Sequence, residues 1–338
     1  LLDNAEREIM DVSEKRNQSG FKKIGEVVGE SWQKIQDLAA NGGEEVTGTA
    51  TGYIELDKMT TGLHPGELII LAARPAVGKT AFALNIARNV GTKTNKTVAI
   101  FSLEMSAESL VNRMLCAEGS IQSNHLRTGE LTPEEWQSLT VSMGNLSESR
   151  IFIDDTPGNR IASIRANCRR LKKEAKHEQG VDDPGLGLIV IDYLQLIEGN
   201  NKESRQQEVS EISRQLKKLA NELQVPIIAL SQLSRGVEQR QDKRPVLSDI
   251  RESGSIEQDA DIVAFLYRDD YYERDGSDEN NGAPGAPQMS QAPVSDDDDT
   301  GQGEVEVIIE KNRSGARGTV PLLFLKAYNK FSNVSYRK

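Results

Sequence analysis

Residues 73–80 read A-R-P-A-V-G-K-T, which places a glycine, a lysine and a threonine at the spacing of a phosphate-binding loop. The apolar run E-L-I-I-L-A before them has the length of a strand, and residues 81–90 have the apolar spacing of a helix. In a strand–loop–helix of this kind, backbone N–H groups and the positive end of the helix attract phosphate. We expect Lys79 to reach the β- and γ-phosphates of a nucleotide and the Thr80 hydroxyl to hold Mg²⁺.

The loop departs from the usual pattern G-x-x-x-x-G-K-[ST] at its first position, where Ala73 stands in place of glycine. A chance G-K-T at a helix start is the alternative, and the flanking strand and helix argue against it. The sequence therefore predicts that the nucleotide is bound by the loop and the start of the helix, namely Ala73, Arg74, Pro75, Ala76, Val77, Gly78, Lys79, Thr80 and Ala81.

Three polar side chains follow predicted strands, at the edge of a parallel sheet where ligands bind. Asp192 ends the run L-I-V-I-D, which is apolar on both faces like a buried parallel strand, and it could hold Mg²⁺ through water. Glu104 follows V-A-I-F-S-L and could deprotonate the water that attacks a γ-phosphate. Gln232 follows V-P-I-I-A-L and could sense that phosphate. A capping Asp, a solvent-facing Glu and a polar strand end are the structural alternatives.

The charge of the chain is unevenly distributed. The 338 residues carry a net charge of −11, but residues 269–304 hold eleven acidic residues and one basic residue, so the remainder is close to neutral. A nearly neutral body can carry the local basic loops that bind nucleic acid. The two cysteines and three histidines are scattered, which predicts neither a structural metal nor a disulfide framework. With no visible signal peptide or membrane-spanning apolar run, we expect a cytoplasmic protein without membrane contact.

The pattern of elements predicts an α/β fold, with a mostly parallel central sheet flanked by helices. Residues 1–42 contain two stretches with helical spacing and form a linker or subunit-docking segment; packing on their own domain or on a neighbouring subunit fits equally well. Residues 43–338 form the motor domain. Within it, residues 275–303 are rich in Gly, Pro, Ser and Asp, and we expect this acidic insert to be disordered.

Several longer motifs accompany the phosphate-binding loop: F-S-L-E-M, L-I-V-I-D-Y-L-Q-L-I, A-L-S-Q-L-S-R, D-I-R-E-S-G-S-I-E-Q-D-A-D and K-N-R-S-G-A-R-G-T. With these motifs the sequence resembles the bacterial replicative DNA helicases of the DnaB type, from about residue 43 to the end and in the preceding linker helix. The resemblance implies a RecA-like fold and a ring homo-hexamer that binds ATP and Mg²⁺ between subunits. It also implies 5′ to 3′ movement on single-stranded DNA, with primase and a helicase loader as partners.

Residue roles follow from the same resemblance. It assigns Lys79 and Thr80 to phosphate and Mg²⁺, Asp192 to the metal, and Glu104 to the activation of water. Gln232 would couple the γ-phosphate to the DNA-binding loops. Ala73 is usual in this family, in which the loop commonly begins with A-R-P.

Two further groups of residues are assigned by resemblance alone. Lys311 and Arg313 match the pair that enters the adjacent subunit's site, with Arg313 as the arginine finger. Arg251, Glu252 and Gly254 match the loop that grips single-stranded DNA in the central channel. The globular N-terminal collar domain of the family has no counterpart in this sequence, and the acidic insert is longer than expected.

Two other functions fit a nucleotide-binding chain of this type. One is a RecA-like recombinase ATPase that coats DNA, and the other is an assembly scaffold in which ATP only controls ring closure. The DnaB-type motifs favour the helicase.

Overall fold

A computed structural model describes residues 23–40, 46–94, 96–179, 185–198, 205–250, 254–271 and 301–334. The chain divides into two units, residues 1–47 and residues 48–338. The described part of the first unit is helix α2 (Ile24–Ala40). Its apolar side chains Ile24, Val28, Trp32 and Ile35 recur at helical spacing and are 58% to 79% exposed. The first helical stretch expected from the sequence lies outside the described residues.

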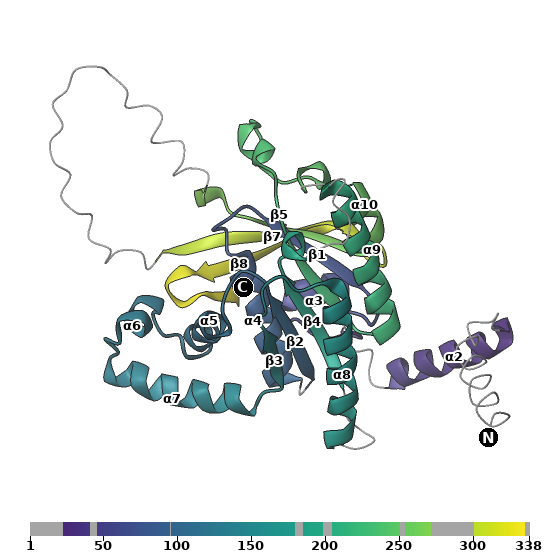
Figure 1. The fold of residues 1–338 in the computed structure, drawn as a ribbon, viewed down its shortest axis with the longest axis horizontal. Helices are drawn as coiled ribbons and strands as arrows, with labels where there is room; N and C mark the ends of the chain where they lie inside the picture. Colours follow the sequence, from purple (N-terminus) through teal and green to yellow (C-terminus); the bar gives the residue numbers. More distant parts are fainter. Residues whose placement is uncertain are drawn as a thin grey trace. The chain divides into compact units, whose positions relative to one another are not determined.

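The second unit is built on one sheet, which has nine strands within the described residues, in the order β3-β2-β4-β5-β1-β6-β7-β8-β9 (Figure 1). The six strands from β3 to β6 in this order are parallel, and β7, β8 and β9 extend the sheet antiparallel. The strands are β1 (Leu68–Ala73), β2 (Thr97–Ser102), β3 (Ile151–Asp154), β4 (Leu186–Asp192), β5 (Ile227–Gln232), β6 (Ile262–Tyr267), β7 (Gln302–Asn312), β8 (Gly318–Leu325) and β9 (Lys330–Asn333).

Helices cover both faces of the parallel strands, which is why strands β1, β2, β4 and β6 are buried throughout. Because side chains alternate along a strand, Leu68, Ile70 and Ala72 of β1 join one apolar cluster, whereas Ile69 and Leu71 join the other. The first cluster includes α8 (Ile161–Gln179), α9 (Arg205–Leu223) and α10 (Gly254–Asp259). The second includes α3 (Ile54–Thr60), α4 (Lys79–Lys93) and α5 (Ala107–Gly119). Helices α6 (Ser123–Thr128) and α7 (Pro133–Glu148) pack beside α5.

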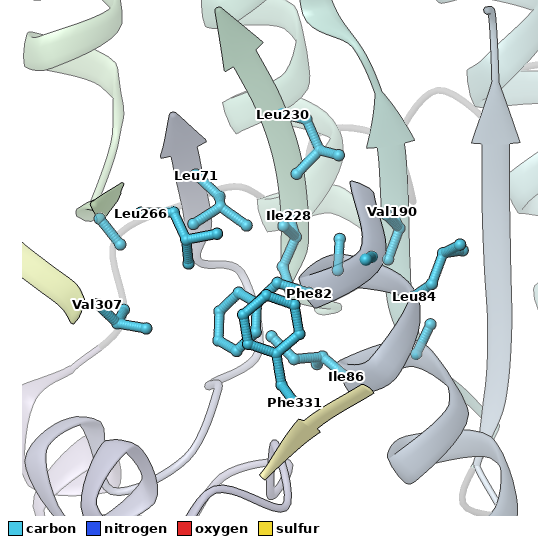
Figure 2. Packing of buried hydrophobic residues seen from close by; sticks show 14 of the residues in the cluster. Leu71, Phe82, Leu84, Ile86, Val190, Ile228, Leu230, Leu266, Val307 and Phe331 are labelled. Carbon is cyan, nitrogen blue, oxygen red and sulfur yellow. The ribbon is translucent and has the colours of Figure 1, made fainter. Parts of the chain in front are cut away.

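The centre of the second cluster is the face of α4 that follows the phosphate-binding loop (Figure 2). Phe82 and Ile86 of α4 lie over Leu71 and Ile228 of the sheet. The Phe331 ring of β9 closes the other side, with its centroid 5.0 Å from that of Phe82. Burying aromatic and aliphatic side chains of this size contributes about 1.5–3 kcal/mol each. This packing fixes the start of α4 relative to the sheet.

The sequence predicts most of these elements, with four exceptions. It does not identify α3, α6, α10 or β9. Residue Gly254, expected in a flexible loop, instead opens α10, and β7 begins at Gln302 rather than at Glu304. Residues 275–300 of the acidic insert lie outside the described part of the chain. Among the helices that the structure describes, none is both long and apolar enough to cross a membrane.

Candidate nucleotide-binding site

The loop between β1 and α4 lies at the carboxyl edge of the parallel strands and lines a pocket of about 430 Å³. Eight of the nine loop and helix residues predicted to bind the nucleotide line this pocket. The exception is Val77, which is 1% exposed and belongs to the core. Glu104 and Gln232 line the same pocket. The structure therefore brings the phosphate-binding loop together with two of the three polar side chains that follow strands.

The loop backbone explains which positions require small residues. Gly78 has a φ of 111°, and a Cβ there would lie 3.2 Å from Phe331 Cζ. Ala76 also has a left-handed backbone, with a φ of 63°, which costs an L-residue about 1–2 kcal/mol. Ala73, by contrast, is the last residue of β1 and pairs with Gln232 in ordinary strand geometry. Glycine is therefore not required at the first position of the loop.

The first turn of α4 is suited to an anion. The helix begins at Lys79 after Gly78, and no side chain caps its N-terminus. The first N–H groups of a helix have no intrahelical partner, and the helix dipole adds a partial positive charge at this end. A nucleotide phosphate is the ligand that such a helix start binds when it follows a loop of this shape.

Lys79 places a buried ammonium inside the pocket. Its Nζ donates a hydrogen bond to Ser231 O at 3.3 Å and lies 5.0 Å from the centroid of the Tyr193 ring. Burial lowers the pKa of Lys79, and the carboxylates of Asp192 and Glu104 oppose that shift. A cation that is desolvated to this extent interacts strongly with a polyphosphate, because little water screens the charges.

Thr80 and Asp192 form the metal-binding half of the site. The Thr80 hydroxyl donates to Asp192 Oδ2 at 2.7 Å. Asp192 is 4% exposed, and its Oδ1 is buried without a hydrogen-bond partner. Leaving a buried carboxylate oxygen unpaired is costly, and Mg²⁺ prefers hydroxyl, carboxylate, water and phosphate oxygens. These two residues therefore fit Mg²⁺, held by the Thr80 hydroxyl and by Asp192 through water.

Arg74 is in the loop, but its side chain is committed elsewhere. The guanidinium is 9% exposed and donates to Glu238 Oε1 at 2.6 Å and to Leu233 O at 2.8 Å. It thereby ties the loop to the segment that follows β5. Gln232 precedes this segment, so a movement of Gln232 would be felt by the loop on both sides.

Sequence reasoning missed a second wall of the pocket. Arg113 of α5 lines it, together with Phe324, Lys326 and Asn329 from the end of β8 and the turn after it. Asn329 is held in place because its carbonyl accepts a hydrogen bond from Asn85 of α4 at 2.9 Å. No short motif marks these residues. Only the antiparallel pairing of β7, β8 and β9 brings them to the loop.

Lys311 and Arg313 lie at the opposite edge of the sheet from the pocket. Arg313 Nη1 donates to Asp261 Oδ1 at 3.0 Å, and Asp261 Oδ2 accepts from Leu68 N, at the start of β1. The phosphate-binding loop follows the other end of β1, which five residues place roughly 16 Å away. Burial, and then the neighbouring charge of Arg313, lower the pKa of Lys311.

Of the predicted DNA-binding residues, Arg251 and Glu252 lie outside the described residues. Gly254 is the first residue of α10.

The site can be tested at Glu104 without removing the nucleotide. In the Glu104→Gln variant the side chain keeps its size but loses its basicity, so ATP hydrolysis should fall by roughly 10²-fold or more. Binding of a fluorescent ATP analogue with Mg²⁺ should stay near the wild-type affinity. Glu108→Gln, in the first turn of α5, removes the same charge nearby and should leave turnover within about twofold, as surface changes usually do. A Glu104→Gln variant that hydrolyses ATP normally, or that cannot bind it, would contradict the assignment.

A mostly parallel sheet with a phosphate-binding loop after β1 and an acidic residue after β4 defines a P-loop ATPase of the RecA-like fold. The closer identity comes from comparison with known proteins. A family model described as DnaB-like helicase C terminal domain matches residues 48–333. The chain belongs to the DnaB-like helicase family.

Individual relatives agree with this family. The chain is 58% identical to the replicative DNA helicase DnaB of Geobacillus stearothermophilus and 57% identical to the replicative DNA helicase DnaC of Bacillus subtilis (strain 168). Each alignment covers 100% of this chain and 67% of the relative. The resemblance predicted from the sequence is confirmed, and the chain is an ATP-hydrolysing replicative DNA helicase domain.

Solved structures agree on the fold. One of them, a separate ATPase domain, has a TM-score of 0.78 and 39% identity, covering 94% of this chain and 100% of that one. A DnaB-like replicative helicase, whose structure describes its interactions with primase, has a TM-score of 0.75 and 38% identity, covering 98% of this chain and 72% of that one. The predicted fold class is therefore also confirmed.

Proposed function

We propose that this chain is the motor of a ring homo-hexamer that uses ATP and Mg²⁺ to move 5′ to 3′ along single-stranded DNA and to unwind the duplex ahead of it. One observation carries the proposal: within one chain, Arg313 and the phosphate-binding loop lie at opposite ends of β1. Phosphoryl transfer needs a cation on the γ-phosphate. A head-to-tail ring brings the Arg313 edge of one subunit to the pocket of the next.

The state of Arg313 supports this arrangement. Its side chain is 51% exposed, so a neighbouring subunit can reach it. The exposed apolar stripe of α2 supports it as well, because Ile24, Trp32 and Ile35 offer apolar surface that a second copy can bury. We assign residues 1–42 to this linker and docking role and residues 43–338 to the motor.

The chain's own residues divide the chemical work. The helix start and Lys79 hold the phosphates, and Thr80 and Asp192 hold Mg²⁺, which supplies charge neutralisation when bound. Glu104 takes the proton from the attacking water. Arg313 of the neighbouring subunit, with Lys311 beside it, stabilises the charge that develops on the γ-phosphate.

Contacts around α10 support a link between this site and DNA. Lys311 Nζ donates to Glu257 O at 2.6 Å and to Ala260 O at 2.7 Å, at the C-terminal end of α10. That helix begins at Gly254, directly after Arg251 and Glu252, which we assign to the DNA phosphates. A change at the Lys311 edge therefore has a short path to the DNA loop, and Gln232 gives a second path from the pocket.

Partners and compartment rest on the family. A solved relative is described with its interactions with primase, and the same contact, together with a helicase loader, is proposed for the protein to which this chain belongs. Replication takes place where the bacterial chromosome is, so we place the protein in the cytoplasm.

The function is tested by ATP turnover with and without single-stranded DNA, followed by unwinding of forked duplexes. The motor should be stimulated by DNA and should unwind a fork with a 5′ tail but not one with only a 3′ tail. Indifference to DNA would favour a nucleotide-controlled scaffold. Strand exchange without unwinding would favour a recombinase ATPase.

The DNA-binding loop is tested by Arg251→Ala. Side chains that bind phosphates position DNA without reading its sequence, so affinity for single strands should fall about equally for all sequences. The slope of log affinity against log salt should decrease in magnitude by roughly 0.7 for each phosphate that is no longer neutralised. Basal ATP hydrolysis should persist while its stimulation by DNA drops. The exposed Arg127→Ala serves as a control with the same charge change. Equal DNA affinity and equal stimulation in both variants would reject the assignment.

A further inference from the structure

Asp261 lies at the edge of the sheet that carries Arg313, between α10 and β6, and is 5% exposed. Both oxygens of its carboxylate are occupied. Oδ1 accepts from Arg313 Nη1 at 3.0 Å, and Oδ2 accepts from Leu68 N at 2.8 Å and from Lys217 Nζ at 2.6 Å. A buried carboxylate needs this number of donors to offset its lost hydration.

The backbone of Asp261 fastens the same place. Its carbonyl accepts from Arg313 N at 2.9 Å, and its N–H donates to Leu68 O at 2.9 Å. Asp261 is thus joined by main chain and side chain both to the first residue of β1 and to Arg313. Lys217 also donates to Gly66 O at 2.8 Å, so the carboxylate is held from the side of α9 too.

This arrangement directs the Arg313 guanidinium without using up its donors. Nη1 is held by Asp261 and Nη2 donates to Gln258 O at 3.0 Å, whereas a guanidinium carries five N–H groups. Two contacts on a planar group fix its orientation, and the remaining donors stay available to a phosphate. Stabilisation of a transition state is effective only when the donors are oriented beforehand.

We propose that Asp261 is a positioning residue for the arginine finger: through Oδ1 it holds Arg313 in the orientation in which its outward donors meet the γ-phosphate in the neighbouring subunit's pocket. The proposal rests on the trans role of Arg313 given above. It predicts that the loss of this carboxylate acts on the neighbour's site and not on the pocket of the same chain.

The first experiment compares Asp261→Asn with Lys217→Met in the whole protein. The Asn side chain keeps the size of Asp but loses the charge that holds Arg313, so kcat for ATP should fall about 10- to 100-fold, as when a catalytic group loses its outer partner. The KM for ATP and the affinity for a fluorescent nucleotide should stay within about twofold, because the pocket is untouched. Lys217→Met removes the ion pair on Oδ2 but keeps the one to Arg313, so its kcat should stay near that of wild type.

A purely structural role of Asp261 gives a different result. It predicts that the two variants lose thermal stability and activity in parallel, and that result would overturn the proposal. If Asp261→Asn melts below the assay temperature, Asp261→Glu replaces it, since it keeps the charge but displaces the carboxylate by one methylene. The same fall in kcat at an unchanged KM is expected.

The second experiment mixes subunits. Asp261→Asn subunits keep an intact pocket, so mixing them with Lys79→Ala subunits, which keep an intact finger, should restore part of the activity. Mixing them with Arg313→Ala subunits should restore nothing, because both are defective on the finger side. If Arg313→Ala is rescued by Lys79→Ala but Asp261→Asn is not, the positioning role is wrong and the trans finger stands. If Arg313→Ala is not rescued either, although mixed rings form, both fall.

Discussion

Replacing Lys79 by Ala is expected to abolish ATP hydrolysis, with a loss of at least about 10³-fold, because the phosphates lose an oriented, desolvated charge. The other cation of the loop cannot take over, since the Arg74 guanidinium is bound to Glu238 and Leu233 O. Lys79 is also the cation whose charged form Asp192 and Glu104 favour. Without it, their negative charges would repel the nucleotide.

The measurement is phosphate release at saturating ATP, with nucleotide affinity determined separately. Lys93→Ala is a matched control, because Lys93 is exposed in the last turn of the same helix and carries the same charge. It should retain activity within about twofold of wild type, as exposed positions usually do. If Lys79→Ala turns over ATP as Lys93→Ala does, the pocket is not the site of hydrolysis.

The pocket was largely predictable because its main residues belong to local patterns. Thr80, Asp192, Glu104 and Gln232 each sit at the end of a buried strand or the start of a helix, and parallel strands present their carboxyl ends at one edge. The second wall of the pocket was not predictable. Lys326 and Asn329 reach the loop only through antiparallel pairing between segments far apart in sequence, and that pairing leaves no motif behind.

The misplaced element around Gly254 has a similar cause. Helix α10 is six residues long, and so short a helix has little stability of its own. It is held by tertiary contacts: Ile256 is completely buried, and Lys311 donates to carbonyls at the end of the helix. Glycine and serine at the start of the segment suggested a flexible loop, and its neighbours in space decided otherwise.

Arg313→Ala is the second change with a very large expected effect, a fall in ATP hydrolysis of about 10³- to 10⁵-fold, the usual contribution of an arginine finger. The loss should appear in kcat, with nucleotide binding nearly unchanged, because Arg313 lies roughly 16 Å along β1 from the pocket of its own chain. Arg317→Ala is the matched control, since Arg317 is exposed in the same hairpin, and it should remain close to wild type.

Mixing decides whether Arg313 acts in its own subunit or in the next one. Arg313→Ala subunits have an intact pocket, and Lys79→Ala subunits have an intact finger, so neither is active alone. In a head-to-tail ring formed from equal amounts, about one interface in four combines the intact halves. Partial activity should therefore return, with a maximum near equal proportions, and single-stranded DNA should stimulate it. If mixed rings form, as native mass spectrometry would show, and no ratio restores hydrolysis, Arg313 does not serve the neighbouring site. The separation of Arg313 from its own loop would then need another explanation.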